Sequence, residues 1–247
     1  MNRHKITVIT VVYNSENLLE KTILSVVNQS YPLVEYIIID GGSVDRSIEI
    51  IKKYEKDIAT WVTEPDNGIY HAMNKGVKKA TGDWVCFLNS GDAFVDDSTL
   101  QKVADGILQN PDAEIVYGNI FTENKDGSFR EREAGQPGNK HRMYFCHQSA
   151  FTKTEILKAH PFDERHKLSA DLKFFKECYY SSCRFVKLDF PVVYYDTSGI
   201  SNTHREIGLR DNIAVIREID RGISKLHFLL RLYFVIYWRK LTKKSER

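Results

Sequence analysis

The segment that decides the fold is Tyr36–Ser43, which reads YIIIDGGS: an unbroken apolar run, then a carboxylate and two glycines. A short, continuous, β-branched run is typical of a strand covered on both faces of a parallel sheet. Two further runs of this kind are Ile6–Tyr13 and Trp84–Leu88, and polar residues follow each of them. The three runs predict buried strands whose polar ends lie at a common edge of one sheet.

Between these strands the apolar residues repeat at helical spacing. The expected helices lie near 19–27, 47–54, 69–80 and 98–109, with further strands at 59–63 and 115–117. Asn14 or Ser15, Asp66 with Asn67, and Asp97 or Ser98 are the expected helix caps. This alternation predicts an α/β fold with a mostly parallel central sheet flanked by helices and right-handed crossovers. Segments 40–43, 64–68 and 89–92 then fall at the carboxyl ends of strands, where such sheets bind ligands.

The regular alternation of strand and helix patterns ends after Phe121. The polar stretch 123–133 contains Asp126-Gly127 and predicts a hairpin or a mobile loop. A short helix near 153–159, a helix over 170–180, and strands at 184–188 and 192–195 are expected next. Residues 199–247 read as a flexible connection followed by helices, and no internal repeat is present.

Composition excludes several classes of protein. With 42% apolar and 12% aromatic residues among 247, the chain can bury a large core, which excludes wholesale disorder. A net charge of +2 is too small for a nucleic-acid binder. The four cysteines have irregular spacing, which favours reduced thiols in a cytoplasmic protein over disulfides or a zinc site. No apolar run approaches the roughly 18 residues of a membrane span.

The charge is concentrated at the C-terminal end. Seven basic residues and one acidic residue lie within 225–247, a local charge of +6 that leaves −4 for the rest of the chain. Before most of these basic residues, Phe228–Trp238 is apolar apart from Arg231. An interfacial helix on anionic lipid, formed by Ser224–Arg247, would explain both features. A terminal helix packed on the core with a solvated basic end explains them equally well.

Carboxylates at strand ends are the candidate functional groups. Asp40 can accept hydrogen bonds from a nucleobase or ribose, but an Asp-Gly-Gly-Ser turn is an equal alternative. Asp92, in the segment Leu88–Asp92 (LNSGD), can bind Mg²⁺ or Mn²⁺, which need only one or two carboxylates beside phosphate oxygens. A solvated turn is again the alternative. Asp66, taken alone, is an ordinary helix cap.

Together these segments resemble glycosyltransferase family 2, and more closely the non-processive bacterial enzymes of colanic-acid, capsule and O-antigen assembly. The resemblance rests on five ordered motifs and covers roughly residues 4–200. The motifs are Val12–Ser15 (VYNS), Asp40–Asp45 (DGGSVD), Glu64–Tyr70 (EPDNGIY), Ala72–Gly76 (AMNKG) and Ala80–Trp84 (ATGDW).

The resemblance implies the GT-A fold, the fold of nucleotide-diphospho-sugar transferases. It divides the chain into a catalytic domain at 1–198, with a nucleotide-sugar half (1–117) and an acceptor half (118–198), and a helical, basic extension at 199–247. The implied reaction is inverting transfer of one sugar from a nucleotide-diphospho-sugar, a UDP-sugar in most relatives. The acceptor would be a hydroxyl of a saccharide or lipid-linked saccharide in bacterial cell-surface polysaccharide synthesis. The implied location is the cytoplasm, with peripheral contact at the inner face of the cell membrane.

Donor-site roles are carried over position by position. Asp40 would contact the base, and Asp66 with Asn67 would lie in the nucleotide pocket, while Tyr13 and Asn14 would line its floor. Asn89–Asp92 matches the metal-binding acidic motif of the family, although Asn89 replaces its first acidic residue. Asn89 would therefore face the donor, and Asp92 would be the one sure carboxylate ligand of Mn²⁺ or Mg²⁺.

The second half carries the acceptor side. Asp171 matches the general base of the family, although Ala170 stands where many relatives have glutamate. An inverting displacement needs such a carboxylate within hydrogen-bond reach of the acceptor hydroxyl. A helix N-terminal charge is the structural alternative for Asp171. His147 and Gln148 would line the acceptor site, and a structural histidine is the equal alternative for His147.

Two other function classes remain open at this point. One is a sugar-phosphate nucleotidyltransferase, although the glycine-rich basic loop usual in such enzymes is missing from Val12–Ser15. The other is a non-catalytic, membrane-associated binding module. A processive polysaccharide synthase is disfavoured, because the sequence has neither spanning helices nor a Gln-x-x-Arg-Trp motif.

Overall fold

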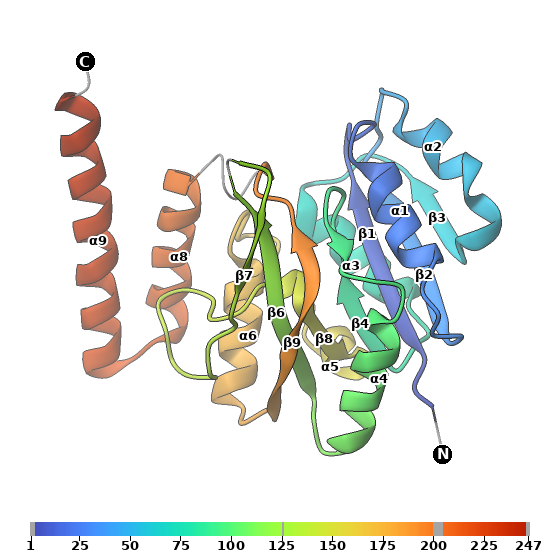
Figure 1. Ribbon diagram of the computed structural model, residues 1–247. Coiled ribbons are helices and arrows are strands. Elements are labelled where there is room, and N and C mark those ends of the chain that lie inside the picture. Colours follow the sequence, from blue (N-terminus) through green and yellow to red (C-terminus); the bar gives the residue numbers. More distant parts are fainter. Residues whose placement is uncertain (1–2, 125, 200–204, 246–247) are drawn as a thin grey trace.

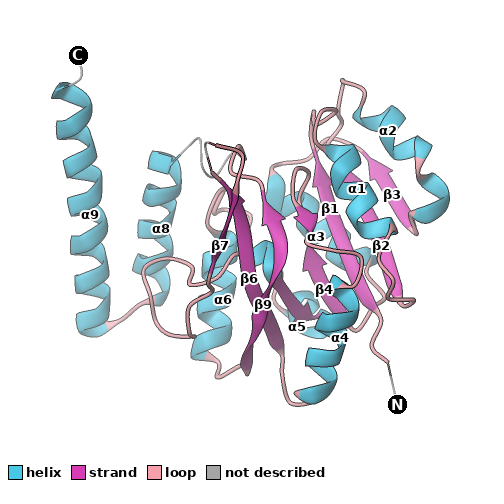
Figure 2. Ribbon diagram, in the orientation of Figure 1, coloured by secondary structure: helices cyan, strands magenta, loops and turns pink. Residues whose placement is uncertain are grey.

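A central sheet with helices on both faces forms the body of the protein (Figures 1 and 2). The computed structural model describes residues 3–124, 126–199 and 205–245. The strand order is β3-β2-β1-β4-β8-β6-β9-β5, and β7 pairs with β6 beside this path. The strands are β1 (Ile6–Val12), β2 (Val34–Asp40), β3 (Thr60–Thr63), β4 (Trp84–Phe87), β5 (Ala93–Phe94), β6 (Ile115–Glu123), β7 (Phe129–Arg132), β8 (Ala150–Lys153) and β9 (Phe185–Tyr195).

Helices connect these strands and extend the chain beyond them. They are α1 (Leu19–Val27), α2 (Ser47–Lys53), α3 (Ile69–Lys79), α4 (Thr99–Gln109), α5 (Thr154–Ala159), α6 (Ala170–Tyr180), α8 (Arg205–Ile219) and α9 (Gly222–Ser245). Short 3₁₀ turns lie at Glu55–Asp57 and His147–Ser149. The helices expected in the first half, the short helix after residue 153 and the helix over 170–180 are all confirmed within a few residues.

Two hydrophobic cores follow from the alternation of side chains along the strands. Ile6 and Val8 of β1 face one side, where they pack with α1 and α4. Ile9 and Val11 of the same strand face the other side, where they pack with α3 and α6. A strand that is buried on both faces requires the nearly continuous apolar run seen in the sequence.

The N-terminal half of the sheet is parallel, as expected. β3, β2, β1 and β4 pair in parallel, and Val12, Asp40 and Thr63 stand level with one another at the strand ends. The second half differs, because β8 pairs antiparallel with both β4 and β6, so the sheet as a whole is mixed. The expected hairpin after residue 123 is confirmed: β6 and β7 pair antiparallel, with Gly127 at φ +80° near the turn.

Two local expectations differ from the structure. A single strand, β9, replaces the two strands expected at 184–188 and 192–195, and its register shifts at Pro191. Proline lacks an amide donor, so the ladder is irregular there without ending. The side chain of Asn14 does not cap α1: it accepts a hydrogen bond from the amide of Val44, with its own backbone at φ +45°. The Asn14 side chain instead joins the end of β1 to the loop after β2.

The C-terminal helices lie along one side of the molecule. α8 contacts α6, and α9 packs against α8 on the outside of the structure (Figure 1). Ile213 and Ile216 of α8 and Leu232 of α9 form the small core between the two helices. None of the helices within the described ranges combines the length and the apolar character needed to cross a membrane.

Candidate active site

The loops that follow β1, β2 and β3 are joined to one another at the carboxyl edge of the sheet. The amide of Asn14 donates to Oγ of Ser43 at 2.8 Å, which ties the end of β1 to the loop after β2. Oγ1 of Thr63 donates to Oδ2 of Asp40 at 2.5 Å, which ties β3 to the same loop. The structure thereby brings together the segments that the sequence placed at strand ends.

Asp40 is fully buried and organises this edge. Its carboxylate accepts hydrogen bonds from the amides of Gly42 and Ser43 at 3.1 and 3.0 Å and from Oγ of Ser43 at 2.5 Å. These bonds, together with the one from Thr63, fold the 41–43 turn. The contact between Asp40 and a base therefore stays a prediction, and in this structure the carboxylate serves the turn that the sequence offered as its alternative.

Gly41 is closely approached by an acidic and an aromatic side chain. A Cβ atom at position 41 would lie 3.1 Å from Oδ2 of Asp66 and 3.5 Å from the ring of Tyr13. The Tyr13 side chain is 68% exposed, which is unusual for an aromatic ring at a strand end. Asp66 is mostly buried and ion-paired with Lys75 rather than capping α3. The next residue, Asn67, donates its amide to Nδ1 of His71 at 3.1 Å.

The 89–92 turn after β4 adjoins this edge. Oγ of Ser90 lies 2.7 Å from Oγ of Ser15, which links the turn to the end of β1. Oδ1 of Asn89 is buried and makes no hydrogen bond within the described part of the chain. Asp92 is 2% exposed, and Oδ1 accepts the amide of Asp196 at 2.8 Å. Burial raises the pKa of Asp92 to about 7, despite the hydrogen bond from Asp196 and the nearby charge of His147.

Asp171, the predicted base, lies in a hydrogen-bonded cluster with two side chains from other elements. Oδ2 of Asp171 is 2.8 Å from Nδ1 of His147, and Oδ1 accepts the hydroxyl of Tyr70 at 2.8 Å. Burial acts to raise the pKa of Asp171, but the bonds from His147 and Tyr70 outweigh it and lower that pKa. The carboxylate is therefore ionised near neutral pH.

The two predicted acceptor residues differ in their surroundings. Nε2 of His147 is buried and has no hydrogen-bond partner in the part of the chain that is described. A buried polar atom without a partner is costly unless a ligand group pairs with it. Gln148 is 5% exposed, and its Oε1 accepts the thiol of Cys146 at 2.7 Å. Only His147 therefore offers an unused polar atom.

Sequence reasoning missed the roles of two residues. Tyr70 belongs to a motif quoted above, but its hydroxyl meets Asp171 only because α3 and α6 pack on the same face of the sheet. Asp196 follows the last strand and reaches the 89–92 turn from a position 104 residues away from Asp92. The signal that could have found Asp196 is its place directly after an expected strand.

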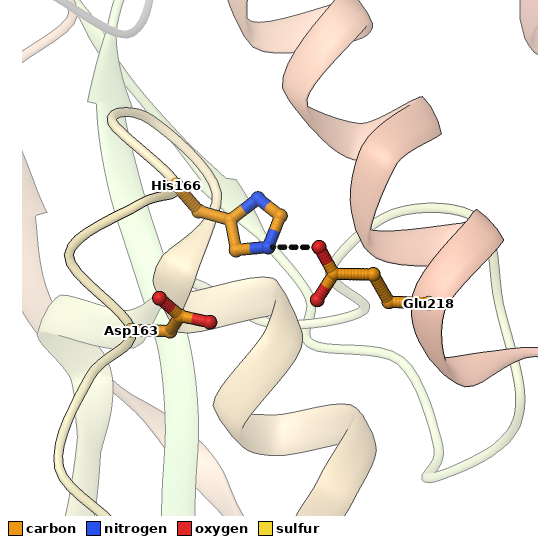
Figure 3. Close-up of side chains that lie close together, drawn as sticks. All are labelled: Asp163, His166 and Glu218. Carbon is orange, nitrogen blue, oxygen red and sulfur yellow. Dashed lines mark ion pairs between the residues drawn. The ribbon is translucent and has the colours of Figure 1, made fainter.

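A second cluster of ionisable groups lies away from these loops, between α6 and α8 (Figure 3). It comprises Asp163, His166 and Glu218, and Nε2 of His166 is 3.4 Å from Glu218. Nζ of Lys173 already lies 2.6 Å from Asp163 and 2.7 Å from Glu218. Because this ammonium group and Arg165 both pair with the two carboxylates, the cluster is an ion-pair network that fastens α8 to the rest of the molecule.

Comparison with known proteins decides the family. The family model described as glycosyl transferase family 2 matches residues 7–162, which is more than half of the chain. The chain belongs to glycosyl transferase family 2. It is a glycosyltransferase, and neither the nucleotidyltransferase nor the binding module is favoured any longer.

Named relatives of this family 2 glycosyltransferase occur in bacteria. A PGL/p-HBAD biosynthesis glycosyltransferase of Mycobacterium tuberculosis is 27% identical over 238 residues, covering 87% of this chain and 90% of the relative. An uncharacterized glycosyltransferase of Haemophilus influenzae is 42% identical over 113 residues, covering 44% of this chain and 45% of the relative.

Solved structures share the fold of this family 2 glycosyltransferase. S. aureus TarS in complex with UDP-GlcNAc has a TM-score of 0.69 at 21% identity, covering 93% of this chain and 71% of that one. The mannosyltransferase PcManGT from Pyrobaculum calidifontis, in complex with GDP-Man and Mn²⁺, has a TM-score of 0.69 at 18% identity, covering 94% and 69%. The expected GT-A fold is thus confirmed.

Proposed function

We propose that this family 2 glycosyltransferase moves one sugar from a UDP-sugar to a hydroxyl group with inversion of the anomeric centre. The observation that carries the proposal is the hydrogen-bonded carboxylate of Asp171, close to the strand-end loops through Tyr70 and His147. The bound nucleotides of the structural neighbours, UDP-GlcNAc in TarS and GDP-Man in PcManGT, support the donor class. We include in the proposal the role in bacterial cell-surface polysaccharide synthesis that the family resemblance implies; the mycobacterial relative named for PGL/p-HBAD biosynthesis is likewise a bacterial glycosyltransferase.

The donor nucleotide would bind beside Gly41. The exposed ring of Tyr13 offers an aromatic surface to the base, and Asn14 and Asn67 offer amide groups to the ribose. Asp66 lies across the same space with Oδ2 free of hydrogen bonds in the described part of the chain. Asp40 would support this pocket indirectly, because its carboxylate holds the 41–43 turn in place.

The 89–92 turn would hold the divalent cation, Mn²⁺ or Mg²⁺. The oxygen chemistry around the turn fits such an ion, because the buried Oδ1 of Asn89 has no hydrogen-bond partner among the described residues, and the carboxyl groups of Asp92 and Asp196 both meet the turn. When bound, the cation neutralises the charge that develops on the departing diphosphate.

Asp171 would accept the proton of the acceptor hydroxyl. The hydroxyl oxygen forms a bond to the anomeric carbon, the bond from that carbon to the diphosphate oxygen breaks, and its electron pair leaves with the nucleoside diphosphate. Within the described part of the chain, Oδ2 of Asp171 accepts one hydrogen bond, from His147, whereas Oδ1 accepts two, from Tyr70 and the amide of Leu172. Oδ2 therefore keeps a lone pair for the proton.

His147 would contact the acceptor. Its Nδ1 is engaged by Asp171, so the buried and unused Nε2 is the atom that can meet a saccharide hydroxyl. Gln148 is enclosed beside Cys146 and would act by supporting the turn that carries His147. The acceptor class that we propose is a saccharide or lipid-linked saccharide.

The outer face of α9 would contact the cytoplasmic surface of the membrane. One face of the helix, including Phe228 and Leu232, packs against α8. The opposite face forms a stripe of exposed apolar side chains. Its members are Ile223, Leu226, Leu230, Phe234, Tyr237 and Trp238. The basic C-terminal sequence that follows this stripe complements anionic lipid, so the full chain should bind such vesicles.

Vesicle flotation tests this contact. The triple variant Leu226→Ser, Leu230→Ser, Phe234→Ser changes only the exposed stripe and leaves the α8-facing side intact. It should lose binding to vesicles that contain phosphatidylglycerol, while the wild type binds them and ignores purely phosphatidylcholine vesicles. Equal binding by both proteins would exclude the stripe, and a wild-type dimer that the variant abolishes would assign the stripe to self-association.

The proposed reaction is tested with nucleotide sugars directly. A thermal-shift screen of UDP- and GDP-sugars, with and without Mn²⁺, should reveal stabilisation by a UDP-sugar, because a ligand of the native state raises the melting temperature. The same donor should release UDP slowly with water as the acceptor. Release of pyrophosphate in place of UDP, or stabilisation by GDP-sugars alone, would contradict the proposal.

A further inference from the structure

We propose that the carboxylate ligand of the divalent cation is Asp196, in the loop after β9, and that Asp92 positions it. The inference rests on the proposed function, because it concerns the cation that accompanies the donor diphosphate. It assigns a role to a residue that neither the sequence motifs nor the family resemblance pointed to.

The carboxylate of Asp196 occupies the space of a missing side chain. Gly91 has φ +103°, and a Cβ atom there would lie 2.7 Å from Oδ2 of Asp196 and 3.1 Å from its Cγ. The turn contributes no acidic side chain of its own at positions 89–91, which are Asn89, Ser90 and Gly91. Asp196 therefore brings a negative charge to a loop that the sequence leaves neutral at these positions.

Asp92 is poorly placed to bind a cation itself. It is 2% exposed, and its Oδ1 accepts the amide of Asp196 at 2.8 Å. The carbonyl of Asp92 and the amide of Gly91 are both bonded to Oγ1 of the buried Thr22, at 2.7 and 2.9 Å. This network fixes the turn and holds the backbone of Asp196 against it, which is a positioning role.

Asp196 has the charge and the access that a ligand needs. Its side chain is partly exposed, and its two oxygens accept bonds from the amide of Ser198 at 2.9 Å and from Oγ of Ser198 at 2.6 Å. Within residues 3–124, 126–199 and 205–238, no Lys, Arg or His forms an ion pair with it. A carboxylate that has no cationic partner among these residues and lies against Gly91, in the turn whose Asn89 Oδ1 also lacks a partner in the described chain, suits a hard cation that draws its other ligands from phosphate and water.

Mn²⁺ binding measured by electron paramagnetic resonance tests the assignment without requiring turnover. Full-length wild type, Asp196→Asn, Asp92→Asn and the control Asp189→Asn, an exposed β9 carboxylate, are titrated with Mn²⁺ alone and with Mn²⁺ plus UDP. Asp196→Asn should weaken Mn²⁺ binding by at least about tenfold. Asp92→Asn keeps an oxygen acceptor for the amide of Asp196 and should change the affinity much less, and Asp189→Asn should match wild type.

Other outcomes separate this inference from the proposed function. Wild-type affinity in Asp196→Asn, loss of binding in Asp92→Asn alone, or a wild type that binds no Mn²⁺ in either titration would overturn the role of Asp196. If wild type binds Mn²⁺ and Asp196→Asn does not, while UDP binds neither protein, the metal assignment holds and the donor proposal fails. Restoration of Mn²⁺ binding to Asp196→Asn by a second change, Asn89→Asp, would show that the turn needs one carboxylate from either side.

Discussion

Oδ2 of Asp171 lies 2.8 Å from Nδ1 of His147, and both side chains are mostly buried. The two residues come from different elements, the first turn of α6 and the 3₁₀ turn before β8. Because Nδ1 of His147 is held by a carboxylate, the free Nε2 has a fixed direction. In the function that we propose, the pair would combine a proton acceptor and a hydrogen-bonding group for the acceptor sugar in one rigid unit.

Asp171→Asn is expected to reduce sugar transfer by about a hundred-fold or more, because the amide cannot accept the hydroxyl proton. Affinity for the proposed UDP-sugar donor, measured by calorimetry, should remain near wild type, since our proposal assigns Asp171 to the acceptor side. The matched control is Asp112→Asn, which removes the charge of an exposed carboxylate at a position distant from Asp171 in the sequence. Full transfer activity in Asp171→Asn would show that another group is the base.

Gly41→Val is expected to block the donor pocket while leaving the fold intact. A side chain at position 41 would extend into the space beside Asp66 and Tyr13, which lie 3.1 and 3.5 Å from its Cβ. We expect UDP affinity to fall by about tenfold or more, equivalent to roughly 1.4 kcal/mol. Gly138→Val is the control, because a Cβ there would meet only Lys140 at 3.7 Å. Equal UDP binding by both variants would place the nucleotide elsewhere.

Glu35 is expected to make stability depend on pH in the acid range. Burial acts to raise the pKa of Glu35, but hydrogen bonds from Thr7, Thr81 and Lys5 outweigh it and lower the pKa to about 2. A carboxyl with a lowered folded-state pKa stabilises the protein above its unfolded-state pKa, near 4.5. That contribution is lost as the pH falls from about 4.5 through about 2.

Glu35→Gln tests this dependence. At pH 7 the variant should lose about 1–3 kcal/mol of unfolding free energy, since bonds to a charged acceptor are replaced by weaker ones. The difference from wild type should shrink as urea unfolding is repeated at lower pH. A difference that stays constant between pH 7 and pH 3 would mean that the charge of Glu35 contributes nothing.

Lys173→Met is expected to loosen the attachment of α8. Its ammonium group bridges Asp163 and Glu218, and its side chain is 11% exposed, so removal leaves the two carboxylates to the exposed Arg165 and, for Glu218, to His166. The expected loss is about 3 kcal/mol of unfolding free energy. Arg165→Met is the matched control, since Arg165 pairs with the same two acids but is 72% exposed, and should lose less than about 1 kcal/mol. Similar losses in both variants would refute the bridging role of Lys173.

The sequence by itself determined the parallel half of the fold. Apolar runs such as Ile6–Tyr13 can be satisfied only between two layers of helices, and the polar residues after each run had to meet at one edge. Local physics sufficed there, because period and strand direction fix which ends converge. The same reasoning placed Asp40 and Asp66 at the ends of strands, whereas Asp171 became a candidate only through the family resemblance.

Tertiary structure alone decided which of these groups are free to act. Sequence spacing cannot show that the carboxylate of Asp40 accepts its hydrogen bonds from the turn that follows it. Nor can it show that the hydroxyl of Tyr70 donates to Asp171, which lies 101 positions away. It also cannot tell that Asp196 lies over Gly91, because that contact depends on the antiparallel pairing of β9 with β5, the strand that follows the 89–92 turn. Burial and hydrogen-bond competition are properties of the packed chain, and they set the chemistry of each carboxylate.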